Sequence, residues 1–408
     1  MSAQTADAPR SKRLPQTEFI ALMAMVSATV AFSIDAMLPA LPEIGAAVSP
    51  DNLNRAQLII TSFILGLGVG TFFTGPLSDA FGRKPVLLGG TIVYILASVA
   101  AWQAQTIEVI LVARVLQGLG ASGPRVVAMA LIRDLYSGPQ MARILSFVMI
   151  VFALVPAMAP TLGHYIVVVF DWHAIFMACV LFSFISTTWL LIRQPETLMP
   201  ENRRALSIKA VGRALVEMFS HQTARLSIFV QTLTFAMLYS MLSSTQQVFD
   251  QTYGHGDTFH LWFGGIAVVA ASSGFLNARV VIRLGMRAVI KGMYLAQILV
   301  TLVLILSLLV GTPASIAFPI YVFWVLTNFF QAGMTIGNLN ALGMEEMGHM
   351  AGLAASVLTS VATVGAVLIA VPIALLFDGT PMPMAIGSLV LASLALWLTT
   401  LIKRPGEV

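Results

Sequence analysis

Two charged side chains inside apolar runs are the first candidates for chemistry. Asp35 lies within an apolar run and is followed by Leu38-Pro39, and Arg114 lies about two turns into a later run, with Gln117 on the same helical face. Charges at such positions are costly and are functional candidates by default. Because desolvation and a nearby cation shift a carboxyl's proton affinity in opposite directions, we predict that Asp35 binds and releases a proton, with Arg114 as its partner.

Each of these residues also has a structural interpretation. Asp35 is then an acid solvated at the end of a helix, and Arg114 is a buried arginine that donates to backbone carbonyls. Both interpretations stay open at the level of the sequence.

A second group of charges lies at the ends of apolar runs. The segment Gly75-Pro-Leu-Ser-Asp-Ala-Phe-Gly-Arg-Lys84 is a short charged turn between two such runs, and Arg133-Asp134 closes the run that contains Arg114. We predict a charge network of Asp79, Arg83 and Asp134 that holds neighbouring helix ends together and acts in gating. The alternative is a generic turn with charges that only set topology. The candidate gate residues are Gly75, Asp79, Gly82, Arg83, Lys84 and Asp134.

The composition says what kind of molecule must position these residues. Of the 408 residues, 58% are hydrophobic and only 10% are charged, whereas soluble domains carry about 25% charged residues. So little charge cannot cover a water-exposed surface, and the chain is therefore an integral membrane protein. Its single cysteine, Cys179, excludes an internal disulfide and suggests no metal cluster or redox pair.

Apolar runs long enough to cross a bilayer recur along the whole chain. A spanning helix needs about 20 apolar residues, and runs of this length exclude barrel strands. We predict an all-α membrane protein with twelve spans, at 17–39, 57–76, 86–104, 107–132, 143–169, 173–193, 225–248, 259–282, 287–310, 314–340, 352–377 and 383–402.

Lysine and arginine predict the orientation of these spans. With a cytoplasmic N-terminus, 19 of the 22 basic residues face inside, Arg55 faces outside, and Arg114 and Arg125 lie within a span. This asymmetry indicates that both termini are cytoplasmic, and it accounts for the pI near 9.4 without nucleic acid. The inside residues are Arg10, Lys12, Arg13, Arg83, Lys84, Arg133, Arg143, Arg193, Arg203, Arg204, Lys209, Arg213, Arg225, Arg279, Arg283, Arg287, Lys291, Lys403 and Arg404.

The chain divides into two similar halves. We predict a tail at 1–16, a six-helix bundle at 17–193, a cytoplasmic linker at 194–224, a second bundle at 225–402 and a tail at 403–408. The linker includes a possible amphipathic segment at 206–219. Gly285-Met-Arg287 repeats Gly82-Arg-Lys84 at an offset of 203, with Ile282 in place of the acid. Such repetition is typical of transporters with rocking halves.

The charged turn resembles a motif of the major facilitator superfamily. The loop between that family's second and third helices reads roughly G-x-L-[SA]-D-R-x-G-R-[KR], and this chain departs from it at Ala80. Arg114-Val-Leu-Gln-Gly-Leu-Gly-Ala121 resembles the family's fourth-helix motif R-x-x-Q-G-x-G. The resemblance implies two six-helix bundles, a proton-coupling role for Arg114, and a loop network that locks the outward-open state. It also implies that the loop acid meets the helix beginning near Gly352.

Further marks resemble the bicyclomycin/chloramphenicol-resistance (Bcr/CflA) branch of proton-coupled drug exporters. These are Asp35-Ala-Met-Leu-Pro39, Thr74, Ile132-Arg-Asp-Leu-Tyr136, Pro156-Ala-Met-Ala-Pro160 and Asp171-Trp172-His-Ala-Ile-Phe176. Met37 stands where that branch usually has an aromatic residue.

The fifth span keeps part of an antiporter pattern. Antiporters of the family typically show G-P-x-x-G-G there, whereas this chain has Ala159-Pro160 and Gly163-His164. Pro156, Pro160 and Gly163 still predict a kink. His164 is interpreted as a packing residue rather than a proton site.

Polar and amphipathic groups at membrane depth are candidates for a substrate cavity. Trp324, Asn328 and Gln331 share one helical stripe. Such groups also serve simply to bond neighbouring helices, and Arg125 fits either cavity lining or packing. The predicted cavity set is Met37, Gln117, Arg125, Gln231, Tyr239, Trp324, Asn328 and Gln331.

We therefore predict a proton-coupled exporter of small, moderately hydrophobic compounds in the bacterial inner membrane. It is expected to act as a monomer in the lipid bilayer, without a metal or any cofactor other than the proton. The alternative is an importer or facilitator of a polar metabolite, such as a siderophore or amino-acid derivative. An enzyme is not indicated, because the six histidines are scattered and no nucleophile or phosphate-binding motif occurs. A receptor or scaffold of the same fold stays open.

Overall fold

The computed structural model describes residues 14–402, without the side chains of Ala142, residues 151–153 and Ile208. The predicted inside residues Arg10, Lys12, Arg13, Lys403 and Arg404 lie outside the described range. Between residues 14 and 402 the regular structure is entirely helical. The α-helices are α1 (Gln16–Asp35), α2 (Leu41–Val48), α3 (Leu58–Phe81), α4 (Arg83–Trp102), α5 (Ile107–Leu135), α6 (Gly138–Val169), α7 (His173–Arg193), α8 (Ile208–Ser220), α9 (Gln222–Gln247), α10 (Phe259–Leu284), α11 (Met286–Val310), α12 (Ala314–Gly343), α13 (Ala351–Leu375) and α14 (Met382–Thr400).

Twelve helical segments of residues 14–402 are long and apolar enough to cross a membrane. This confirms the predicted number of spans and the all-α class. The largest difference lies in the first span, which was predicted to end at residue 39 but continues to Val48. After α1 ends at Asp35, the span continues as α2, which begins at Leu41. Pro42 lies in the first turn of α2, a position that tolerates proline. Large apolar side chains point outward along the spans, as a lipid-facing surface requires, among them Leu96, Val112, Phe275 and Leu309.

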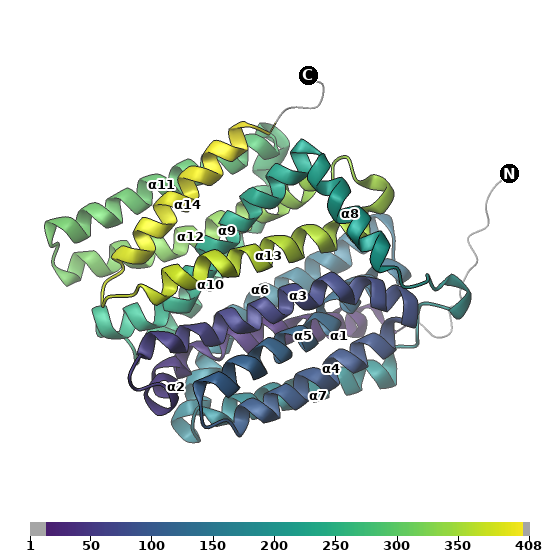
Figure 1. Cartoon of the computed structure of the whole chain (residues 1–408), viewed down its shortest axis with the longest axis horizontal. Coiled ribbons are helices and arrows are strands. Elements are labelled where there is room, and N and C mark those ends of the chain that lie inside the picture. Colours follow the sequence, from purple (N-terminus) through teal and green to yellow (C-terminus); the bar gives the residue numbers. More distant parts are fainter. Residues whose placement is uncertain (1–13, 403–408) are drawn as a thin grey trace.

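The helices pack in two groups that meet along the long axis of the molecule (Figure 1). Helix α5 is held between α3 and α4, and α9 packs against α12, α13 and α14. The two groups contact each other through α3 with α13 and through α6 with α10. These two seams are where any relative movement of the groups must occur.

One end of the molecule carries most of the charge. The turns between α3 and α4, α5 and α6, α10 and α11, and α12 and α13 lie there, together with α8. We call this the basic end, because its described cations include Arg83, Lys84, Arg133, Arg193 and Arg287. The opposite end carries α2 and Arg55.

The predicted repeat is visible in the backbone. Gly82 ends α3 with φ +104° and ψ 162°, and Gly285 ends α10 with φ +81° and ψ 156°. Such positive φ angles favour glycine. The two halves therefore use the same sharp turn at positions 203 residues apart. The linker between them contains α8, close to the predicted segment 206–219, and Ser207 caps it by accepting from the amide of Ala210.

Candidate functional site

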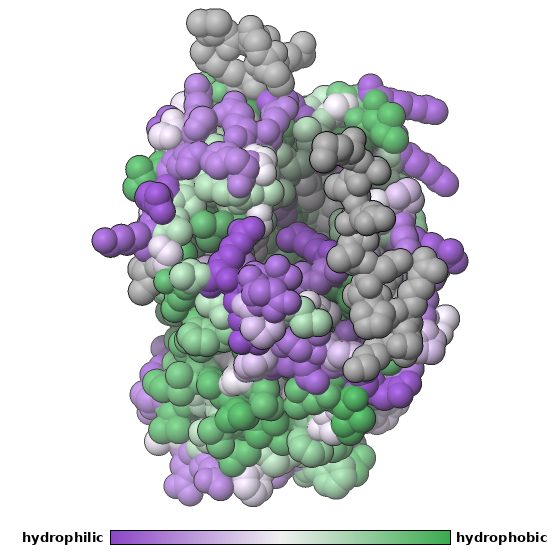
Figure 2. All heavy atoms as spheres, turned by 90° about the vertical axis from the view of Figure 1, so that its right-hand side faces the viewer, coloured by the Kyte–Doolittle hydropathy of each residue, from purple (hydrophilic) through white to green (hydrophobic). Residues whose placement is uncertain are grey.

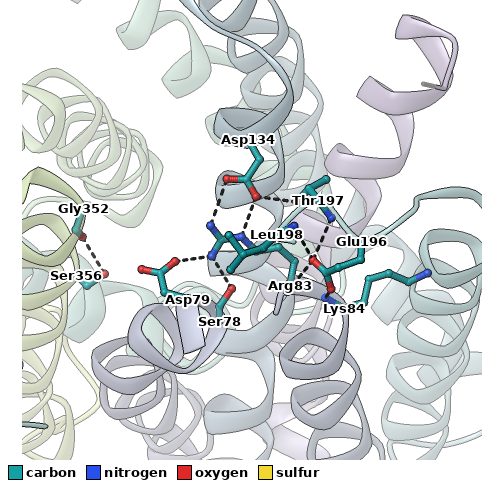
Figure 3. Close-up of polar contacts among 10 residues, drawn as sticks. All are labelled: Ser78, Asp79, Arg83, Lys84, Asp134, Glu196, Thr197, Leu198, Gly352 and Ser356. Carbon is teal, nitrogen blue, oxygen red and sulfur yellow. Dashed lines mark hydrogen bonds and ion pairs between the residues drawn. The ribbon is translucent and has the colours of Figure 1, made fainter. Parts of the chain in front are cut away.

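Arg83 joins the ends of α3, α4 and α5 at the basic end (Figure 3). Its Nη1 donates to Asp79 Oδ1 at 2.6 Å and to Ser78 Oγ at 2.9 Å. Its Nε and Nη2 donate to the two carboxylate oxygens of Asp134 at 2.8 and 3.2 Å, which is a bidentate contact. Arg83 is only 7% exposed. The predicted network of Asp79, Arg83 and Asp134 is therefore present, while its gating role stays a prediction.

The other candidate gate residues of the turn have separate tasks. Gly82 makes the turn that brings Arg83 back to Asp79, and a Cβ there would lie 3.0 Å from Arg203 Nη2. Lys84 lies outside the network and donates from Nζ to Leu191 O at the end of α7, at 2.8 Å. Gly75 lies at the seam between the halves, since a Cβ there would lie 3.4 Å from Ser356 Oγ on α13.

Glu196 caps the N-terminus of α4. This role was not predicted from the sequence. Its carboxylate accepts from the backbone N–H groups of Arg83 and Lys84 at 3.0 and 2.9 Å. These are donors that a helix N-terminus leaves without partners, and the helix dipole favours an anion there. The neighbouring Thr197 donates from Oγ1 to Asp134 at 2.7 Å. The capping residue lies over 110 positions from the helix it caps. The sequence therefore shows only an acid in the linker and does not indicate which helix it caps.

We expect Glu196→Ala to lower the stability of the protein by about 1–2 kcal/mol, because it removes a cap from two orphan donors. The measurement is the melting temperature of the purified protein in detergent. Glu201→Ala is the control, because Glu201 is exposed in the same linker and has no hydrogen bond or ion pair among the described residues. Equal melting of the two variants would contradict the capping role.

A cavity of about 650 Å³ opens between the two groups of helices at the basic end. Its walls come from α3 and α5 on one side and from α13 and the linker on the other. Figure 2 looks onto this end and shows hydrophilic side chains gathered around a hollow. Asp79, Gly352 and Ser356 all line the cavity, yet no hydrogen bond or ion pair joins Asp79 to the described residues of α13. The contact that the resemblance implied for Asp79 is therefore absent from this conformation, and Ser356 donates to Gly352 O instead (Figure 3).

The opposite end is closed by uncharged polar groups that join the two halves. Gln57 binds the side chain of Gln247 and accepts from Ser244 Oγ at 2.7 Å. Asn54 accepts from Gln247 Nε2 at 2.9 Å and donates to Phe377 O at 2.8 Å. The molecule is thus open at the basic end and closed at the opposite end. This closure was not predicted from the sequence, because single amides at helix ends have no recognisable pattern.

The predicted ion pair between Asp35 and Arg114 is wrong for this conformation. The depth was predicted correctly, because Arg114 Nη2 donates to the backbone oxygen of Ser33, two residues before Asp35, at 3.0 Å. Asp35 itself is 6% exposed and has no hydrogen bond or ion pair with any described side chain. Arg114 donates to carbonyl and amide oxygens instead of a carboxylate. In this conformation its contacts match the alternative interpretation, a buried arginine that donates to backbone carbonyls.

Arg114 ties four helices together. Its side chain is fully buried, and Nε donates to Ile59 O on α3 at 3.0 Å, while the guanidinium lies 4.5 Å from the centre of the Phe63 ring. Nη1 donates to Gln117 Oε1 at 2.6 Å, and Gln117 in turn donates to Ser98 Oγ on α4 at 2.7 Å. Gln117 therefore orients Arg114 rather than lining the cavity at the basic end.

Helix α6 reaches α1 beside Asp35. A Cβ on Gly163 would lie 2.1 Å from the backbone oxygen of Ala36, so only glycine permits this approach. Helix α6 continues through Pro156 and Pro160, and the predicted kink stays a prediction. His164 stacks on His260 of α10 with ring centres 4.2 Å apart, at the seam between the halves.

Comparison with known proteins decides the family. The family model described as Major Facilitator Superfamily matches residues 20–370. The chain belongs to the major facilitator superfamily. It is 30% identical over 385 residues to the bicyclomycin resistance protein homolog of Haemophilus influenzae, covering 92% of this chain and 94% of that protein. Over 147 residues it is 38% identical to the multidrug resistance protein MdtL of Escherichia coli, which covers 36% of this chain. The resemblance to the bicyclomycin-resistance branch is thereby confirmed.

Solved structures share the superfamily fold at low identity. A D-xylose-proton symporter superposes with a TM-score of 0.76 at 13% identity, covering 93% of this chain and 97% of that chain. The E. coli xylose transporter XylE in a partially occluded inward open conformation gives a TM-score of 0.75 at 12% identity, covering 95% and 98%. These likenesses establish the transporter fold.

In this major facilitator protein, only Arg125 of the predicted cavity set lines the cavity at the basic end. Trp324 is fully buried and donates to Thr301 Oγ1 at 2.9 Å, which binds α12 to α11. Asn328 and Gln331 donate within α12 itself. Helical spacing placed these groups on one face correctly, but that face packs on another helix. The other members outside the lining of this cavity are Met37, Gln117, Gln231 and Tyr239.

Proposed function

We propose that this protein is a proton-coupled exporter of small, moderately hydrophobic compounds that works by alternating access. The family makes it a multi-pass membrane transporter, and the distribution of lysine and arginine supports a cytoplasmic location for the basic end in a bacterial cell. The present conformation is then the one that loads substrate from inside, with the opposite end closed.

The observation that carries proton coupling is the unpaired carboxyl group of Asp35. It is buried at a helix end, beside the α1–α6 contact at Gly163, and lacks a described cation or hydrogen-bond donor. A charged carboxylate without partners is expensive in such surroundings, whereas a neutral one is tolerated. Closed packing around Asp35 therefore stabilises the protonated form of its side chain, and opening toward water stabilises the charged form.

This difference couples the proton to the movement of the halves. A proton taken up from outside neutralises Asp35 and permits the closure of the opposite end by Asn54, Gln57 and Gln247. Release of that proton to the inside then favours the return, because a ligand shifts a conformational equilibrium by its differential affinity for the two states. Arg114 acts in this scheme by fixing α1 through Ser33 O rather than by pairing with the carboxylate.

The direction of transport is supported by the names of the relatives. A bicyclomycin resistance protein homolog matches almost the whole chain, and multidrug resistance proteins match part of it. Resistance to a compound follows naturally from its export. Import or facilitated entry of a polar metabolite is the competing outcome of the experiment below.

The test uses inverted membrane vesicles with an imposed pH gradient. A susceptibility screen of an efflux-deficient host first selects the transported compound, with bicyclomycin included. With one proton exchanged per molecule, a gradient of one pH unit supports about tenfold accumulation. We expect Asp35→Asn to remove this response to the gradient, and Asp51→Asn to preserve it, because Asp51 is an exposed acid at the opposite end.

Two results would overturn the proposal. Uptake that ignores the pH gradient in both the wild type and Asp35→Asn would exclude antiport. Accumulation driven in the opposite direction would establish an importer.

A further inference from the structure

The cavity at the basic end has an excess of positive charge. Four arginines line it, namely Arg83, Arg125, Arg133 and Arg204, against the two aspartates Asp79 and Asp134. Both aspartates bind the same arginine, Arg83, at 2.6 and 2.8 Å. The other three arginines have no ion pair with any described residue. A cleft lined by one sign of charge concentrates ligands of the opposite sign.

Arg125 is the deepest of these unpaired cations. It lies ten residues before the end of α5, which places it about 15 Å from the basic end of that helix and near the middle of a hydrocarbon core about 30 Å thick. Its residue is half-buried, and its side chain has no hydrogen bond to any described group. Its electrostatic neighbour is the hydroxyl of Tyr239, on α9 of the other half. An uncompensated guanidinium at membrane depth is expensive.

Arg114 shows how this protein accommodates a buried arginine whose hydrogen-bond partners all belong to the protein. Arg114 donates three hydrogen bonds, to Ile59 O, Ser33 O and Gln117 Oε1, and lies over an aromatic ring. Arg125, eleven residues along the same helix, makes none of these contacts and faces open space instead. The contrast indicates that the partner of Arg125 is not part of the protein.

Apolar side chains form part of the remaining wall of the cavity, beside polar ones such as Thr71, Ser356 and Thr359. Val126, Met129, Leu353 and Ala355 line it, and Tyr239 beside Arg125 stacks on Phe235 with ring centres 5.4 Å apart. A ligand that suits both parts of this wall has one anionic group and an apolar body. The planar guanidinium matches a carboxylate, which it can bind through two parallel hydrogen bonds.

We propose that the cavity binds organic acids, with the carboxylate held by Arg125 and the apolar body against Met129 and Leu353. Arg133 and Arg204, nearer the mouth, draw the anion in from the aqueous side. This inference rests on the proposed transport function and names the substrate class of that site. It narrows the predicted small, moderately hydrophobic compounds to those that carry a carboxylate.

The experiment compares two fluorescent probes that differ only in charge. Dansylglycine carries a carboxylate, and dansylglycinamide carries a neutral amide of nearly the same shape. Binding to the purified full-length protein in detergent is followed by the rise in dansyl emission in apolar surroundings. We expect the wild type to bind dansylglycine more tightly than dansylglycinamide. Arg125→Gln should weaken the binding of dansylglycine by about 10- to 100-fold, the range for a lost hydrogen bond to a charged group. Binding of dansylglycinamide should change by less than about threefold.

Two further variants separate charge recognition from structure. Arg125→Lys keeps the charge without the planar fork, and we expect it to recover part of the affinity for dansylglycine. Arg283→Gln is the matched control, because Arg283 is exposed at the same end of the molecule and lies outside the cavity lining. It should bind both probes as the wild type does.

Three results would overturn the organic-acid site. The first is equal affinity of the wild type for both probes, and the second is no binding of dansylglycine up to about 1 mM. The third is an equal loss of affinity for both probes in Arg125→Gln, which would make Arg125 a structural cation. The assay needs no pH gradient, so Asp35→Asn should still bind dansylglycine. A failure of proton coupling and a failure of anion recognition are thereby distinguished.

Discussion

Replacement of Gly118 by valine is expected to prevent the protein from accumulating in a folded form. A Cβ on Gly118 would lie 1.9 Å from the backbone oxygen of Phe63 and 2.8 Å from the amide nitrogen of Leu67. Both obstacles are backbone atoms of α3, which cannot rotate away. The helices would have to separate by more than about 1 Å to restore a normal contact. Overpacking of this kind costs about 3 kcal/mol or more.

The same movement would damage the cluster around Arg114. Arg114 lies one turn before Gly118 on α5, and its bond to Ile59 O is made one turn before Phe63 on α3. Separation of α3 from α5 therefore stretches that bond as well. This is the physical reason for the glycine in the fourth-helix motif, which is a packing requirement rather than a chemical one.

The measurement is the monodisperse yield and the melting temperature of Gly118→Val and Gly118→Ala in detergent. Gly89→Ala is the control, because a Cβ on Gly89 in α4 would meet no atom within 4 Å. We expect the melting temperature to fall in the order Gly89→Ala, Gly118→Ala, Gly118→Val. Wild-type stability of Gly118→Val would show that the close approach of α3 and α5 is not needed.

The fold and the charged turn could be predicted because their signals are strong and local. Runs of about 20 apolar residues have few alternatives in a membrane, and the observed helices follow them closely. Asp79, Arg83 and Asp134 lie at helix ends that the topology brings to the same face, so opposite charges find each other. The echo of the turn at Gly285 could be read from the sequence for the same reason.

The partners of buried groups could not be predicted, because they depend on the side-chain contacts of helices distant in sequence. Arg114 and Asp35 reach the same depth, but the backbone oxygen of Ser33 takes the bond instead of the carboxylate. A carbonyl oxygen is available at every residue and leaves no trace in the sequence. Glu196 was missed for a related reason, since its partners are the amides of a helix more than 110 residues earlier.

Replacement of Arg83 by glutamine is expected to cost about 3 kcal/mol of stability, because breaking a buried ion pair leaves charges without partners. The side chain of Arg83 is 9% exposed and neutralises two carboxylates that approach it from α3 and α5. Without it, Asp79 and Asp134 face each other across the same space. We also expect the helix ends at the basic end to loosen, which lowers the rate of any movement that depends on them.

The repeat in the sequence supplies a matched control for this prediction. Arg287 follows the equivalent turn in the second half, where it aligns with Lys84. Its one ion pair among residues 14–402 is with Glu345, at 3.3 Å, in a more exposed position. Arg287→Gln should therefore cost no more than about 1 kcal/mol, as surface pairs do. Melting temperatures of the two variants in detergent test the difference directly.

A triple variant shows whether the loss of stability in Arg83→Gln comes from the two carboxylates that are left without a cation. Arg83→Gln combined with Asp79→Asn and Asp134→Asn removes the repulsion together with the cation, so it should melt above Arg83→Gln alone. If the triple variant melts lower, Asp79 and Asp134 stabilise the helix ends independently of Arg83. The turn would then consist of separate capping contacts, and the rigid link that gating requires between α3, α4 and α5 would have to come from Glu196 and the linker.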